Sequence, residues 1–301
     1  MKTNWIPTHQ YYHQLLHASD PESRQQLYLD LIVEPWKPMM AMVQGRGGAE
    51  NNDDLAGARA WNWLLPDQIE MIRTLLAKME AAQAWERGEE AFVRATAAFA
   101  PWQDQIKIEE ITGWLLLADP TRSNRFEPGY TGATDWLSPR FVCQFWEPNE
   151  YNLARISTVI AHELHHLIRL RAFPWDMFRT SVADYIVLEG TAESFATALF
   201  GADKVGHFVT GLSADEFEDA RQLIGKGLQA TGFNVLRSYI FGDALAEQSG
   251  YQPLGGMPTY GGYAVGYHVV QAFLERSGLS IEEATFVPAN EIVEQSGFFG
   301  V

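Results

Sequence analysis

The sequence predicts a mainly helical α+β protein with a small β-sheet, and three observations support this fold class. Hydrophobic residues make up 47% of the 301 residues and aromatic residues 13%, so the chain can bury a substantial core. Helix-start signals recur along most of its length. Two short segments, 105–119 and 140–146, are rich in Ile, Phe, Val and Trp and are bounded by turn residues, which is typical of strands.

The first hundred residues are expected to be mostly helical. Asp20-Pro21-Glu22 combines a cap residue, a proline at the first helical position and an acid in the first turn, so a helix should begin there and run to about residue 33. A second helical stretch is expected over 66–99, with an interruption at Gly88. The intervening residues 44–58 contain several Gly, Asn and Asp residues without periodicity and predict a loop.

Beyond the two predicted strands the chain is expected to be helical again. Residues 127–134, between those strands, are rich in Gly and Thr and predict a loop. Ser213 and Ser280 are each followed three residues later by Glu, which indicates capping boxes. The expected helices cover 151–171, 181–201, 213–230, 263–277 and a last segment from 280. We therefore predict an N-terminal helical subdomain over 1–104 and a second domain over 105–301.

Charge and cysteine content exclude several function classes. The formal net charge is −16, and no Lys/Arg-rich run is present to neutralise phosphates, so nucleic-acid and anionic-membrane binding are not expected. Cys143 is the single cysteine, which excludes an intramolecular disulfide framework. Apolar runs are far shorter than the roughly 20 residues that a spanning helix needs, and the N-terminus has no apolar signal core. We expect a cytoplasmic protein; the oligomeric state is not predicted.

The main candidate for a catalytic metal site is the segment His162-Glu163-Leu164-His165-His166. It matches the pattern H-E-x-x-H, in which two His residues bind a zinc ion and the Glu acts on the water bound to it. On a helix, side chains four residues apart are separated by about 40°, so the two imidazoles converge with the carboxylate beside them. Apolar residues on the other side predict that this helix is buried next to its ligand edge; these are Ile156, Ile160, Leu164 and Leu167.

Catalytic zinc normally has three protein ligands, and the third is expected in the segment 188–193. Glu189 and Glu193 lie four residues apart and share a helix face, and Gly190 allows two helix backbones to approach closely. We assign Glu189 as the ligand and Glu193 as the carboxylate that orients a ligand His. The reversed assignment, and two solvated surface acids, remain as alternatives.

Three segments resemble a bacterial family of predicted zinc-dependent proteases, the YjaZ-type proteins. They are 161–166, 189–193 and Gly262-Tyr263-Ala264-Val265-Gly266-Tyr267, and the resemblance covers roughly residues 105–290. It implies a zincin-like fold of the subgroup whose third zinc ligand is glutamate (the gluzincins), and leaves the first hundred residues unassigned. The third segment is also similar to the Gly-Gly-Tyr-x-x-x-Tyr helix of zinc oligopeptidases, which implies that its tyrosines contact the substrate.

Tyr267, and after it Tyr263, are the candidates to stabilise an oxyanion, because a tyrosine hydroxyl can donate to the developing charge. The alternative is that both are core aromatic residues.

Other histidines and arginines are given no role in the reaction. His9, His13 and His17 repeat every fourth residue and are expected to form a polar helix surface rather than a second metal site. His165 is expected to line the cleft without binding metal. Arg169 is explained by a favourable interaction with the C-terminal end of its helix.

Together these residues predict a metallopeptidase with one catalytic Zn²⁺ held by His162, His166 and Glu189, with Glu163 as general base. The expected partner is a peptide or protein substrate, neutral or basic rather than strongly acidic, and the strand 140–146 is expected to pair with its backbone. One alternative is a zinc-binding regulatory or peptide-binding module that does not cleave peptides. A second is a helical interaction protein that binds no metal.

Overall fold

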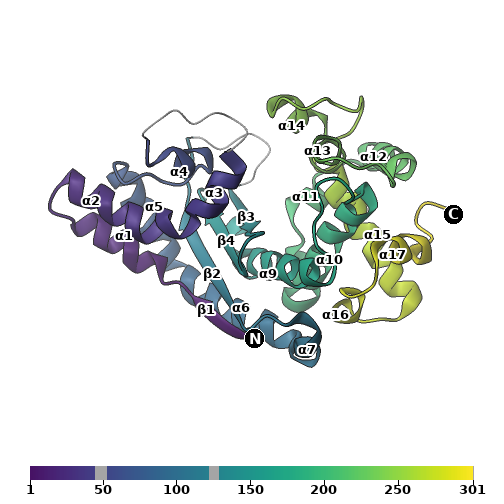
Figure 1. Ribbon diagram of the computed structural model, residues 1–301, viewed down its shortest axis with the longest axis horizontal. Coiled ribbons are helices and arrows are strands. Elements are labelled where there is room, and N and C mark those ends of the chain that lie inside the picture. The colour runs from purple at the N-terminus through teal and green to yellow at the C-terminus, as the bar shows by residue number, and fades with distance from the viewer. Residues whose placement is uncertain (45–52, 122–128, 301) are drawn as a thin grey trace. The chain divides into compact units, whose positions relative to one another are not determined.

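The computed structural model describes residues 1–44, 53–121 and 129–300 (Figure 1). The chain divides into two compact units, one formed by residues 1–97 and 108–164 and the other by residues 98–107 and 165–301. The prediction of a mainly helical α+β protein with a small sheet is confirmed. Among the described helices, none is both long enough and apolar enough to cross a membrane.

The first unit contains a four-stranded mixed sheet in the order β1-β2-β4-β3. β1 (Lys2–Trp5), β2 (Glu110–Leu117) and β4 (Arg140–Phe145) are parallel, and β3 (Tyr130–Thr134) is antiparallel to β4. Most of β2 is buried, as expected for a parallel strand covered on both faces. β4 is hydrogen-bonded on both sides, so the expectation that it pairs with a substrate backbone is wrong.

Two strands were not expected from the sequence. β1 has only four residues, and its partner β2 lies about a hundred residues further along the chain. The predicted loop over 127–134 was wrong where it is described, because residues 130–134 form β3; residues 127 and 128 lie outside the described residues. β2 begins later than expected because Lys107, at φ +55°, ends a preceding short helix, α7 (Gln103–Ile106).

The helices of the first unit follow several of the expected signals. The Asp20 carboxylate caps α2 by accepting a hydrogen bond from the Ser23 amide (2.8 Å), and a π-helical turn continues it to Val33. The interruption expected at Gly88 lies instead near Gln83, which has φ +53°; Gly88 is inside α6, against Trp5 and Ile160. Part of the predicted loop 44–58 is helical and its residues 45–52 lie outside the described ones. The α-helices are α1 (Thr8–His17), α2 (Pro21–Tyr28), α3 (Lys37–Gln44), α4 (Ala56–Ala60), α5 (Ile69–Ala81), α6 (Ala84–Ala98) and α8 (Glu150–Leu153).

The helix that carries the H-E-x-x-H segment is α9 (Ile156–Ala172), and it passes from the first unit into the second after Leu164. A single helix over 151–171 was expected, but the Arg155 amide donates to the Asn152 carbonyl (3.0 Å) in a tighter turn that closes α8 before α9 begins. The predicted apolar stripe of α9 is confirmed, since Ile156, Ile160, Leu164 and Leu167 are all buried.

The second unit is helical. Three of its helices begin with capping boxes, at Ser181, Ser213 and Ser280, and the latter two confirm the sequence prediction. It contains α7 and the second half of α9, residues 165–172. Its other α-helices are α10 (Val182–Phe200), α11 (His207–Thr210), α12 (Ala214–Gly227), α13 (Phe233–Phe241), α14 (Asp243–Gln248), α15 (Gly261–Ser277), α16 (Ile281–Ala284) and α17 (Ala289–Ser296).

Two glycines allow α10 and α15 to pack backbone against backbone. A Cβ atom at Gly190 would collide with the carbonyl group of Gly266, and a Cβ atom at Gly266 would collide with the carbonyl group of Ile186. The close approach predicted at Gly190 is therefore present, and it brings α15 next to the residue that follows Glu189.

Candidate metal centre

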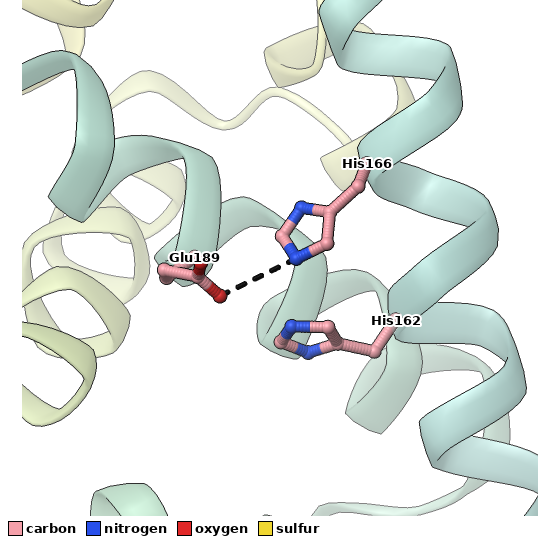
Figure 2. A group of neighbouring side chains, drawn as sticks. All are labelled: His162, His166 and Glu189. Atoms are coloured by element: carbon pink, nitrogen blue, oxygen red, sulfur yellow. Dashed lines mark ion pairs between the residues drawn. The ribbon is translucent and has the colours of Figure 1, made fainter. Parts of the chain in front are cut away.

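Two histidines one helical turn apart point from α9 toward the same place (Figure 2). His162 and His166 are 7% and 8% exposed. They lie on the face of α9 next to its apolar stripe, and packing of that stripe into the core also buries this adjacent face. The predicted convergence of the two imidazoles is thus found in the folded chain.

Glu189 reaches these histidines from α10. Its Oε2 atom lies 3.3 Å from Nε2 of His166 (Figure 2). One ligand atom from each of His162, His166 and Glu189 lies within 4.8 Å of the other two. Within residues 1–44, 53–121 and 129–300, this is the one group of three or more His, Cys, Asp or Glu side chains placed to hold a metal ion.

The three residues fit a zinc ion. Two imidazole nitrogens and one carboxylate oxygen are the donor set of many catalytic zinc sites. Nε2 of His166 and Oε2 of Glu189 are 3.3 Å apart, and all three ligand atoms lie within 4.8 Å of one another, so one ion could contact all of them. Because Glu189 is only 5% exposed, its negative charge is removed from water, and a bound cation would compensate this cost.

Glu163 is held by β3. The hydroxyl of Thr134 lies 3.0 Å from both the carbonyl oxygen and Oε2 of Glu163 and donates to them. The side chain of Glu163 also occupies the place that a Cβ atom at Gly132 would take. Gly132 and Thr134 were not identified from the sequence; the only signal was two small residues two positions apart, which share one face of a strand.

Glu193 is buried one turn beyond Glu189 on α10. Its Oε1 atom accepts a hydrogen bond from the amide of Gly206 (2.5 Å), just before α11. This bond joins α10 to the start of α11. The orientation of a ligand His by Glu193 stays a prediction.

Tyr263 and Tyr267 both lie on α15, and both are partly buried. The Tyr263 ring packs against Phe208, Phe241 and Tyr260, with centroids 5.3 to 5.8 Å apart. Tyr267 directly follows Gly266 at the crossing with α10, and its amide nitrogen lies close to Gly190. Tyr267 therefore lies at the crossing of α15 with α10.

Several residues outside this centre are explained by packing. His165 is fully buried, so its expected place in a cleft wall is wrong. Cys143 is buried as expected, and burial, with a contribution from the Glu163 charge, raises the pKa of its thiol well above the usual value. His13 pairs with Glu80 (2.6 Å) and His17 contacts the His13 carbonyl oxygen (2.7 Å), and neither belongs to the one metal-holding group found among the described residues.

Comparisons with known proteins show which family the chain belongs to. A family described as predicted Zn-dependent proteases matches residues 84–294. The uncharacterized protein YjfC of Bacillus subtilis (strain 168) is 31% identical over 287 residues, which cover 94% of this chain and 95% of the relative. The uncharacterized protein YjaZ of the same strain is 24% identical over 146 residues, 48% of this chain and 52% of that protein. No solved structure matches the chain.

The similarity to YjfC also extends into the first hundred residues, so it covers more of the chain than the expected range of 105–290.

We predict that the protein purified without chelators contains one equivalent of zinc. His162→Ala and His166→Ala should each lose most of it, because two remaining ligands hold the ion poorly. Zinc at a thousand times its dissociation constant should stabilise the apo protein by about 4 kcal/mol. Elemental analysis and thermal unfolding measure both effects. The exposed His17→Ala is the matched control and should retain zinc; equal metal loss in all three variants would contradict this assignment.

Proposed function

The chain belongs to the family of predicted zinc-dependent proteases, and from this premise we propose that it is a zinc metallopeptidase that hydrolyses peptide bonds. The observation that carries the proposal is the buried group of His162, His166 and Glu189, with Glu163 on the same helix as the two histidines. These three residues would hold the metal. A zinc ion bound there supplies a Lewis acid and lowers the pKa of a coordinated water molecule.

Glu163 is the proposed general base. Its carboxylate takes a proton from the attacking water and delivers it to the nitrogen of the leaving amine. The hydrogen bond from the Thr134 hydroxyl to Oε2 holds the carboxylate of Glu163 in one orientation. Because Gly132 has no side chain, the carboxylate can lie directly against β3.

β3 is the proposed binding edge for the substrate backbone. It is an outer strand of the sheet, and the described residues place no further strand beyond it. An extended peptide can add to such an edge through main-chain hydrogen bonds. A peptide bound there would run past Gly132 and Thr134, the two residues that contact Glu163. The net charge of −16 favours neutral or basic peptides over strongly acidic ones.

The hydroxyl of Tyr267, with Tyr263 as the second candidate, is proposed to donate to the oxyanion that forms when the carbonyl carbon is attacked. The position of Tyr267 at the crossing with Gly190 supports this order, since Gly190 directly follows Glu189 on α10.

We expect Glu163→Gln to retain a full equivalent of zinc and to lose about 10²- to 10⁴-fold in cleavage rate, because a general base typically contributes that much. Digestion of a peptide library, read by mass spectrometry, measures the rate, and elemental analysis measures the metal. Glu90→Gln, an exposed position on α6, is the control and should leave both unchanged. If the wild type binds zinc but cleaves no more than Glu163→Gln, the chain is a zinc-binding module instead of a peptidase.

Removing the Thr134 hydroxyl should lower kcat while KM and zinc content stay constant. Thr134→Val keeps the branched shape but leaves Oε2 of Glu163 without this donor, and a loss of about 1.4 kcal/mol corresponds to a ten-fold lower kcat. Thr134→Ser retains the hydroxyl and should recover most of the rate. Equal rates for the Val and Ser variants would show that the hydrogen bond does not matter for turnover.

Tyr267→Phe should lower kcat by about 10²-fold with little change in KM, because one oxyanion donor is typically worth that much. Tyr263→Phe should have a smaller effect. Steady-state kinetics on a single cleaved peptide compare the two variants. The opposite order would assign the role to Tyr263, and full activity in both would remove the tyrosines from the mechanism.

A further inference from the structure

The part of α9 that lies in the second unit carries two buried polar side chains that the proposed reaction does not use. His165 is completely buried and Arg169 is 2% exposed, and they lie four residues apart on one helix face. Both reach the same segment, Ala284 to Val287, at the end of α16. Such burial is costly for a histidine and an arginine unless each is satisfied by specific partners.

His165 is hydrogen-bonded to Thr285. Its Nε2 atom lies 2.9 Å from the Oγ1 atom of Thr285. The same Oγ1 atom lies 2.8 Å from the carbonyl oxygen of Ile281. Oγ1 of Thr285 therefore links the imidazole of His165 to the carbonyl oxygen of Ile281.

Arg169 is tied to carbonyl oxygens. Nη1 donates to the carbonyl of Thr285 (2.8 Å) and more weakly to that of Ala284 (3.4 Å), and Nη2 donates to that of Val287 (3.2 Å). Burial lowers the pKa of Arg169 to about 10, so the guanidinium is still protonated at neutral pH. The expectation that Arg169 simply interacts with the end of its own helix is therefore wrong.

The helix that precedes the segment bound by His165 and Arg169 also contacts α10, the helix that carries Glu189. α16 packs against α10. The His165 ring itself packs against Phe195 of α10, with ring centroids 5.5 Å apart. His165 therefore connects α9 to α10 directly, and Arg169 connects it to the segment that follows α16, a helix that packs on α10. The third member of the proposed metal centre lies on α10.

We propose that His165, Arg169 and Thr285 form a brace that sets the position of His166 relative to Glu189, and that they are positioning residues for zinc binding. The inference rests on the proposed metal centre. His165 directly precedes His166 and Arg169 follows it by three residues, so the brace holds α9 on both sides of the ligand. Ligands from two helices must be held to within about 0.5 Å for tight metal binding, which local helix geometry alone does not ensure.

The test is the zinc dissociation constant of the full chain, measured by competition with a chromophoric chelator, beside the thermal stability of the apo protein. Thr285→Val removes the hydrogen-bond partner of His165 and should raise the dissociation constant by roughly ten-fold, at the low end of the effect of residues that orient metal ligands. Thr285→Ser keeps the hydroxyl and should stay within about two-fold of the wild type. Arg169→Met should weaken zinc binding in the same direction.

Ser238→Ala is the matched control, because Ser238 is a buried residue of the second unit whose hydroxyl donates to the carbonyl of Gln252 (2.8 Å). It should lower the stability of the apo protein without changing the zinc dissociation constant. If Thr285→Val behaves in the same way, the brace is only structural and the proposal is overturned. Zinc binding without cleavage would contradict the peptidase and leave the brace testable, whereas a wild type that binds no zinc would overturn both.

Discussion

The burial of three ligating side chains that converge from two helices is the constraint on which the rest of the structure depends. His162 and His166 come from α9 and Glu189 from α10, and all three are withdrawn from water. A buried carboxylate facing two imidazoles is costly without a cation, so both helices must be held firmly enough to keep the group together. The glycine crossing of α10 with α15 and the contacts of α9 with the end of α16 supply this support.

The proposed general base depends on a different element from the proposed ligands. Glu163 is on the metal helix, but its carboxylate is held by Thr134 and lies over Gly132, both on the outer strand β3. β3, the proposed binding edge for an extended peptide, is thus also the strand that contacts the proposed base. In the proposed reaction, this one short strand would align the peptide bond with Glu163.

Local signals predicted the elements that they specify directly. Asp20, Ser213 and Ser280 begin helices as expected, because a cap acts within three residues. β1 and β3 were not predicted because each is stabilised by pairing with another strand. β1 pairs with β2, which is distant in the sequence, and β3 forms the edge of the sheet beside β4. The choice of strand 140–146 for the substrate failed for the same reason, since strand order is a property of the whole sheet.

The sequence by itself determined the residue types of the candidate centre and the spacing that makes His162 and His166 converge, since four residues along a helix always return to nearly the same face. It also identified Glu189 as the residue that joins them. Only the tertiary structure decided that Glu163 meets Thr134, 29 residues away, and that His165 meets Thr285, 120 residues away. The physical reason is that such hydrogen bonds form only when segments distant in the sequence pack together, so a local sequence pattern cannot predict them.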